Sequence, residues 1–282
     1  MERTTPNMHS KSDTLAPIGV IGAGRLGGAL VDALRQARQP VVGPAGRGEV
    51  LDGCRALVLC VPDAEIPAAA AVVAGAAPLI GHTSGASPLV TLTAAQRAGS
   101  AIFGWHPLQT FADGLASPGG VRATGSGGGG GVLSGVRAFA GAGCAIAGSS
   151  PAALGFAREL AETLGMVPFG LAEEDRAAYH AAASIASNFL VTLQAAAERV
   201  AAGAGLEPDQ ARALLAPLIR RTLDNYLAYG PEQALTGPVA RGDDATVASQ
   251  REAVEQSAPE LLRLFDELVD QTRRVAGREA LA

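Results

Sequence analysis

Three of the four histidines stand where a side chain can take part in proton transfer. His82 and His106 follow short apolar runs, in the segments GHTSGAS and GWHPLQTF, and His180 lies early in a long Ala-rich stretch. Imidazole has the side-chain pKa closest to neutral, so it is the usual general acid or base. Each of these histidines, taken alone, is equally well explained as a core or capping residue.

A stripe of short polar side chains accompanies His180 along the same predicted helix. At about 100° per residue, Ser184, Ser187 and Asn188 fall with His180 within roughly 100° of arc, among Ala, Leu, Val and Phe. A solvent-facing stripe normally carries Lys, Glu or Arg, so this one is typical of a helix that lines a polar cavity. The alternative is a set of interhelical hydrogen bonds at a domain or dimer interface.

The loop TGPVARGD carries an arginine suited to binding an anion. Arg241 is predicted to clamp a substrate carboxylate in a bidentate pair, with Asp243 orienting the guanidinium. Thr236 and Ser84 are predicted to belong to the same substrate site. The alternative is an Arg241–Asp243 ion pair that only pins the loop.

A glycine-rich turn near the start of the chain predicts a nucleotide site. PIGVIGAGRLGG reads as a short strand, a tight turn and the start of a helix, and Gly22, Gly24 and Gly27 form the pattern GxGxxG. Glycines in this context let the backbone approach a pyrophosphate, which the N–H groups of the helix N-terminus bind. Arg25 and Leu26, inside the motif, belong to the predicted site.

The segment VVGPAGRGE after the second strand predicts a preference for NADP(H). An NAD enzyme usually presents Asp or Glu there to the ribose 2′-hydroxyl, whereas here Arg47 is placed to pair with a 2′-phosphate. Val61 and Pro62, at the end of the third strand, and His82, at the end of the fourth, are predicted to contact the cofactor. Arg47 alone leaves a deazaflavin cofactor as an alternative.

The hydrophobic pattern predicts an α/β Rossmann fold, a doubly wound parallel sheet, followed by an all-α domain. The expected strands are 18–21, 41–43, 56–61, 79–82, 101–104, 144–147 and 167–171. The expected helices are 29–38, one that Ser149 or Ser150 caps and Pro151 begins, 173–202, 208–229 and 247–276.

These elements predict a three-part chain. A disordered tail, 1–16, precedes an NADP-binding Rossmann domain, 17–172, and a helical substrate and dimerisation domain, 173–282. The run GSGGGGG at 125–131 is expected to be a flexible surface loop, because glycine loses the most conformational freedom on ordering.

Composition argues against several classes of protein. A formal net charge of −5 with scattered arginines offers no surface to nucleic acid. The small-apolar stretch 68–77 is about half of the roughly 20 residues that span a bilayer, so no membrane segment is expected. The three cysteines lack metal-ligand spacing and predict reduced thiols in a cytoplasmic protein without a metal. Lys11, the single lysine, lies in the tail, so no lysine is available as a catalytic acid.

The motifs GAGRLG, HTSGAS, WHPLQTF, YHAAASIASN and TGPVARGD together resemble a bacterial family with a Rossmann-like domain followed by a C-terminal domain of unknown function. That family is related to the 6-phosphogluconate, pyrroline-carboxylate and ketopantoate reductases, and some members are considered alternative ketopantoate reductases. The resemblance implies a small branched 2-oxo acid as substrate. It also implies a substrate site between the Rossmann crevice and the first long helix, and a homodimer formed through the helical domain.

The resemblance also shows a departure at the predicted catalytic helix. In the 2-hydroxy-acid branches of the superfamily this helix carries Lys and, four residues later, Asn. Here Ser184 and Asn188 have that spacing and the lysine is missing. The proton donor is therefore expected to be His180 or His106, while Ser184 and Asn188 hold the carbonyl or imine.

Three functions remain as hypotheses. The first is NADPH-dependent reduction of a small carboxylate-bearing 2-oxo acid, as in ketopantoate reductase. The second is reduction of a cyclic imine, as in pyrroline-carboxylate reduction. The third is a non-catalytic protein that binds NADP(H) and reports redox state through domain closure, a role in which the histidines and the polar stripe would be unnecessary.

Overall fold

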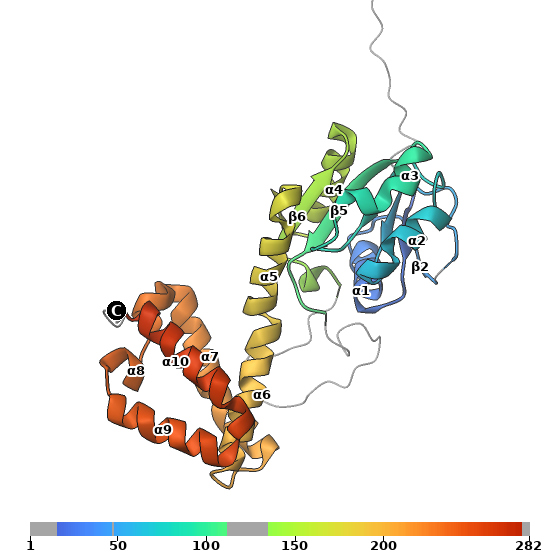
Figure 1. Cartoon of the computed structure of the whole chain (residues 1–282). Helices are drawn as coiled ribbons and strands as arrows, with labels where there is room; N and C mark the ends of the chain where they lie inside the picture. Colours follow the sequence, from blue (N-terminus) through green and yellow to red (C-terminus); the bar gives the residue numbers. More distant parts are fainter. Residues whose placement is uncertain (1–15, 47, 112–134, 278–282) are drawn as a thin grey trace, which may run out of the picture. The chain divides into compact units, whose positions relative to one another are not determined.

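A computed structural model describes residues 16–46, 48–111 and 135–277, and its N-terminal part contains one seven-stranded sheet (Figure 1). The strands are β1 (Ile18–Ile21), β2 (Val41–Ala45), β3 (Ala56–Leu59), β4 (Leu79–His82), β5 (Ala101–Pro107), β6 (Gly143–Gly148) and β7 (Val167–Gly170). Their order is β2-β1-β3-β4-β5-β6-β7. The predicted Rossmann sheet is confirmed.

The last two strands reverse direction. The first five strands are parallel, β6 is antiparallel to β5, and β7 is parallel to β6. A short apolar run indicates a buried strand but carries no sign of its direction, so the reversal could not be predicted from the pattern.

Helices cover both faces of the sheet. Helices α1 (Arg25–Gln36) and α4 (Pro151–Thr163) pack on the face to which Val58 of β3 contributes, whereas α2 (Ile66–Val72) and α3 (Thr93–Arg97) pack on the face of Leu57 and Leu59. Strands buried on both faces read as unbroken apolar runs, which is why β1 and β3 contain no polar residue. Ser150 caps α4 as predicted, since its hydroxyl accepts a hydrogen bond from the N–H of Ala153.

The turn from β1 into α1 depends on two of the three motif glycines. Gly22 has φ +109°, and a Cβ there would lie 2.2 Å from the carbonyl oxygen of Cys60. A Cβ on Gly27 would lie 1.9 Å from the carbonyl oxygen of Gly22, so only glycine lets the helix approach the strand this closely. A Cβ on Gly24 would meet nothing within 4 Å. Helix α1 starts at Arg25, earlier than predicted, because Gly27 and Gly28 belong to the helix and not to the turn.

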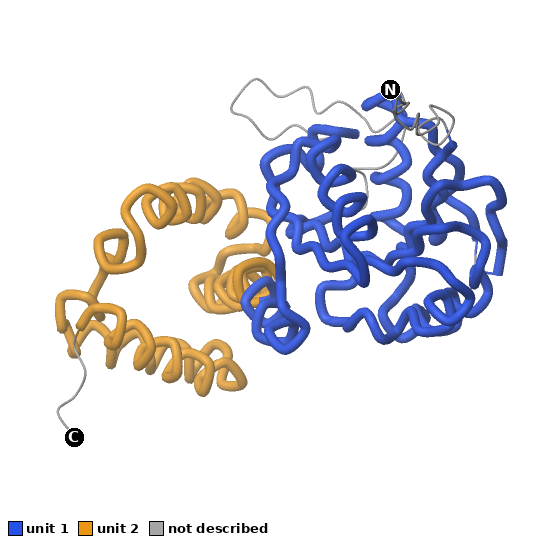
Figure 2. The backbone as a smooth tube through the Cα atoms, turned by 90° about the horizontal axis from the view of Figure 1, so that it is seen from above, with its two compact units in different colours: residues 1–184 blue, residues 185–282 orange. Residues whose placement is uncertain are grey.

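The C-terminal part is helical. Its helices are α5 (Arg176–Ala186), α6 (Asn188–Ala202), α7 (Pro208–Ala234), α8 (Pro238–Arg241), α9 (Asp244–Ser257) and α10 (Leu262–Val275). The chain divides into two compact units, 1–184 and 185–282 (Figure 2). Unit 1 therefore includes most of α5. The sequence predicted a boundary near residue 172, just after the last strand. Single 3₁₀ turns are η1 (Asp63–Glu65), η2 (Leu89–Leu92), η3 (Gly135–Ala138), η4 (Glu173–Asp175) and η5 (Pro259–Leu261).

The prediction that the C-terminal helices are long and continuous is wrong. The helix expected at 173–202 is interrupted at Ser187, and α7 runs past residue 229 through a non-helical Gly230. The helix expected at 247–276 is two helices, because Pro259 disfavours a helical backbone at the preceding Ala258, which has φ −152° and ψ 65°. None of the described helices is both long enough and apolar enough to span a membrane. Residues 1–15 of the predicted tail and the glycine run 125–131 lie outside the described residues.

Replacing Gly27 by Ala should lower the free energy of unfolding by about 1–3 kcal/mol or more, because the added Cβ meets the backbone of Gly22. Urea unfolding followed by circular dichroism measures the change. Gly24→Ser is the matched control, since the site is open and serine is a favourable residue before a helix; its stability should stay within about 0.5 kcal/mol of the wild type. Equal losses in both variants would contradict the packing explanation.

Candidate active site

Three aromatic side chains meet where β5 ends beside α5. Nδ1 of His106 lies 2.8 Å from the hydroxyl of Tyr179, and the ring centroids of His106 and His180 are 6.0 Å apart. All three belong to unit 1. We call His106, Tyr179 and His180 the imidazole–phenol cluster. The two histidines predicted to donate a proton are thus brought together, and Tyr179 is a member that the sequence did not reveal.

Within the imidazole–phenol cluster, both His106 and Tyr179 are uncharged at neutral pH. Burial, and then the neighbouring His180, lower the pKa of His106 to about 4. Burial, and then Cys144, raise the pKa of Tyr179 to about 12. The hydrogen bond therefore joins a neutral imidazole to a neutral phenol, and the tautomer of His106 decides which of them donates.

His82 is a buried residue that organises the loop after β4. Its Nδ1 accepts a hydrogen bond from the N–H of Ser84 at 3.2 Å, so the imidazole proton is on Nε2. Burial, and then the charge of Arg176, lower its pKa to about 4. Among the described residues Nε2 has no hydrogen-bond partner of good geometry, although the backbone of Pro88 acts against the pKa shift. His82 is thus a neutral structural element of this loop.

Ser84 is held inside the same loop. Its hydroxyl oxygen accepts hydrogen bonds from the N–H groups of Ala86 and Ser87, at 3.2 and 2.8 Å. The next glycine lies against the cluster, since a Cβ on Gly85 would be 2.7 Å from Cε1 of His106. The loop therefore forms a fixed wall beside His106, and substrate contact by Ser84 stays a prediction.

Arg176 places a positive charge beneath the cluster. The residue is 4% exposed, and its Nε donates to Oε1 of Glu173 at 2.8 Å. The other carboxylate oxygen of Glu173 accepts the N–H of Leu89 at 2.9 Å, which ties η2 to the start of α5. The positive charge of Arg176 lowers the pKa of His82, His106 and Tyr179. Its burial could not be predicted from the sequence, because an arginine after EED is typical of a solvated helix start.

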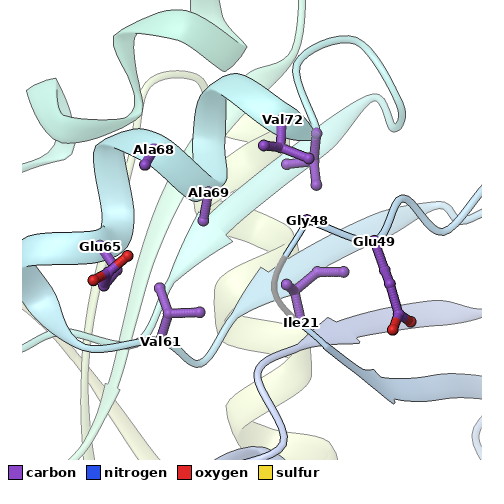
Figure 3. A pocket seen from close by; sticks show the side chains of 9 residues that line it. Ile21, Gly48, Glu49, Val61, Glu65, Ala68, Ala69 and Val72 are labelled. Atoms are coloured by element: carbon purple, nitrogen blue, oxygen red, sulfur yellow. The ribbon is translucent and has the colours of Figure 1, made fainter.

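An apolar cavity lies at the same end of the sheet as the glycine turn (Figure 3). It holds about 440 Å³ including its open mouth. Figure 3 shows Glu65 and Glu49 on opposite sides of the apolar side chains. Its lining residues are Ile21, Gly48, Glu49, Val61, Glu65, Ala68, Ala69, Val72 and Val73.

The predicted cofactor residues have different places around this cavity. Val61 lines it, whereas Pro62 is exposed at the start of η1. Arg47 lies outside the described residues, between Gly46 and the cavity-lining Gly48. Glu49 also lines the cavity, so an acid that the sequence placed beyond the strand end does reach this wall.

The N-terminus of α1 presents backbone without a capping side chain. Gly24 precedes the helix, no side chain caps it, and the first turn has no acidic residue. Arg25 is exposed at the first helical position, and Leu26 packs its side chain against the core. Such a helix start favours an anion.

The other predicted site residues belong partly to unit 2. Ser184 ends unit 1, half-buried, and Asn188 begins α6 in unit 2. Arg241 is exposed at the end of α8. Asp243 caps α9, and its carboxylate accepts hydrogen bonds from the N–H and hydroxyl of Thr246 at 3.1 and 2.7 Å.

The Arg241–Asp243 interaction is electrostatic in this structure. Arg241 contributes to lowering the pKa of Asp243, after the larger effect of the hydrogen bonds from Thr246. Thr236 is exposed between α7 and α8. The described residues contain no group of three His, Cys, Asp or Glu side chains that could hold a metal ion.

Residues 142–272 match the family model described as Domain of unknown function (DUF2520). The match begins just before β6, so it includes the reversed strands as well as the helices. No curated protein matches the chain. The predicted resemblance, a Rossmann-like domain followed by a domain of unknown function, is confirmed.

Solved structures share the fold over nearly the whole chain. A Bacteroides fragilis protein, provisionally described as an NADP oxidoreductase, has a TM-score of 0.70 at 21% identity and covers 94% of this chain and 100% of its own. A Thermotoga maritima protein has a TM-score of 0.65 at 24% identity, covering 92% and 98%. Pyrroline carboxylate reductase of Plasmodium falciparum, solved with NADP bound, has a TM-score of 0.56 at 9% identity, covering 93% and 99%. These likenesses show the Rossmann and helical architecture.

The low pKa values of the buried histidines predict a pH-dependent stability. Between about pH 6.5 and 4 the unfolded chain takes up protons at His82 and His106 that the folded chain does not, so stability falls as the pH is lowered through this window. Urea unfolding from pH 7 to 4.5 should show a smaller loss for His106→Asn than for the wild type. The same slope in both proteins would mean that His106 titrates normally in the folded state.

Proposed function

We propose that this protein is an NADP(H)-dependent reductase of a small C=O or C=N substrate that carries a carboxylate. The observation that carries the proposal is that a proton-transfer cluster and a dinucleotide-type turn share one edge of the sheet. Strands β1, β3, β4 and β5 are parallel, so the glycine turn, His82 and His106 all follow carboxyl ends at that edge. Ligands of open α/β sheets bind at this edge.

The residues of unit 1 fit the cofactor. Gly24 leaves open space in front of an uncapped helix N-terminus, which suits a pyrophosphate. The apolar cavity suits a flat adenine ring, and Arg47, which precedes the cavity-lining Gly48 in the sequence, is proposed to pair with the 2′-phosphate. The structural likeness to a reductase solved with NADP bound adds support. NADPH, when bound, supplies the hydride.

His180 is the proton donor in this proposal. The low pKa of His106 makes it a neutral imidazole at pH 7, already engaged with Tyr179, so it is suited to positioning and not to acting as a cationic acid. His180 adjoins this pair without being part of its hydrogen bond. Ser184, near the end of α5, and Asn188, the first residue of α6, stay the residues predicted to hold the carbonyl or imine, while the helix on which that prediction was based is interrupted at Ser187.

Two substrate classes follow from the same site. The first is a branched 2-oxo acid, as in ketopantoate reductase. The second is a cyclic imine, and it gains support from the fold likeness to pyrroline carboxylate reductase and to the reductive aminase of Aspergillus terreus, solved with NADPH. An imine can bind already protonated and then needs less from His180.

Purified protein should oxidise NADPH faster than NADH with one member of a panel of 2-oxo acids and cyclic imines. His180→Ala should slow that turnover by about 10²-fold or more, with the affinity for NADPH unchanged. Absorbance at 340 nm gives the rate, and a fluorescence titration gives the affinity. Unchanged turnover in the variant would make His180 structural, and NADPH binding with no turnover of any compound would favour the non-catalytic sensor.

The helical unit is proposed to form a homodimer. Among the described residues of unit 2 only five apolar residues are buried: Ala211, Val247, Val254, Ala258 and Val269. Large apolar side chains on α6 and α7 are exposed, among them Phe189 at 54%, Leu218 at 63% and Leu227 at 79%. Apolar surface of this extent normally marks an interface.

We also place the protein in the cytoplasm, where its three free cysteines would stay reduced.

Size-exclusion chromatography with light scattering should give twice the 28.3 kDa chain mass for the wild type. Leu227→Glu should shift the protein to the monomer, because a charge would be desolvated in the interface. Val90→Glu, at a position in unit 1 that is 69% exposed, is the matched control and should leave the dimer intact. A wild-type monomer would mean that the apolar faces of α6 and α7 are not covered by a second copy.

A further inference from the structure

Arg176 is a buried cation with most of its hydrogen-bonding capacity unused. A guanidinium has five N–H groups, and here Nε–H alone donates, to Glu173. The described residues offer no acceptor to Nη1 or Nη2, although Arg176 is only 4% exposed. Nη1 and Nη2 are not among the fully buried polar atoms that lack a partner, so they reach solvent although most of the side chain is buried. Nη1 and Nη2 of Arg176 are thus unused donors that could bind an anion.

The surroundings of Arg176 place these donors at the catalytic cluster. A Cβ on Gly104 of β5 would lie 3.1 Å from Nη2, so the guanidinium rests against the strand that carries His106 two residues later. Its charge acts on His82, His106 and Tyr179, which lie on three different elements. The acids that act on these histidines are Asp63 and Glu173, and Glu173 already accepts Nε–H. Among the described residues, Glu173 is the carboxylate that pairs with Arg176, and it does so through Nε.

We propose that Arg176 is the anchor for the substrate carboxylate, holding it through Nη1–H and Nη2–H in a bidentate pair beside His106 and Tyr179. The proposal rests on the reductase function above and names the side chain that selects an acid substrate. Arg is suited to this role because its planar fork matches two carboxylate oxygens. Glu173 fixes the fork from the other side, and its link to Leu89 holds the pair in place.

This assignment differs from the one that the sequence suggested. Arg241 is exposed and belongs to unit 2. There the carboxylate of Asp243 accepts hydrogen bonds from Thr246. An exposed guanidinium is already hydrated and gains less from a carboxylate than a buried one. Arg176 is 4% exposed, so an incoming carboxylate displaces less water from its guanidinium than from that of Arg241.

The test compares an acid with its neutral ester. Isothermal titration of NADP⁺-saturated protein with 2-oxo-3-methylbutanoate and with its methyl ester measures the preference for the carboxylate. In the wild type the acid should bind more tightly than the ester. Arg176→Met should weaken binding of the acid by about 10²-fold and binding of the ester by less than about threefold. Arg176→Lys keeps the charge but loses the planar guanidinium, so it should weaken binding of the acid by about tenfold. The affinity for NADPH should not change in either variant.

Arg241→Met is the matched control, and its preference for the acid should equal that of the wild type. An acid preference that survives in Arg176→Met, or a wild type that binds acid and ester equally, would overturn the assignment. Should Arg176→Met fail to fold, Arg176→Lys decides by the same comparison. Failure of the reductase function is seen separately: the acid would then bind through Arg176 while NADPH is not oxidised with any carbonyl or imine.

Discussion

Burial of the Arg176 guanidinium is the interaction on which the candidate site depends. One carboxylate, that of Glu173, holds Nε–H and at the same time accepts the N–H of Leu89, so the start of α5 and the η2 turn are joined through a single ion pair. Leu89 follows the loop that carries His82 and Ser84, and Gly104 packs below the guanidinium. Helix α5 is thereby fixed against the end of β5, which brings Tyr179 and His180 to His106.

The same charge and the same burial set the protonation states of the site. Two buried imidazoles beside a permanent cation have low pKa values, and the phenol of Tyr179 keeps its proton. The site therefore consists of neutral side chains, two of them hydrogen-bonded to each other, next to the positive charge of Arg176. In the proposed reduction of an anionic substrate, Arg176 would attract the carboxylate, and the neutral His82, His106 and Tyr179 would not repel it.

The two units reach stability in different ways. Unit 1 has a sheet with apolar residues packed on both faces, and its glycine turn is so tight that two glycines are required by backbone contacts alone. Unit 2 buries few apolar side chains and leaves large ones exposed along α6 and α7. Its helices are therefore expected to gain their core from an interface, which would also explain why short polar and apolar side chains share the same helices.

The sequence by itself determined the Rossmann sheet, the glycine turn, the Ser150 cap and the positions of His82 and His106 at strand ends. These depend on local spacing, because alternating apolar runs, GxGxxG and N-cap chemistry act within a few residues. Tertiary structure alone decided the rest. The reversal of β6, the breaks at Ser187 and Ala258, and the His106–Tyr179 pair, which joins residues 73 positions apart, all depend on packing between distant segments. Arg176 is the clearest case: an arginine after three acids looks solvated, and only the fold buries it beside His106 and Tyr179.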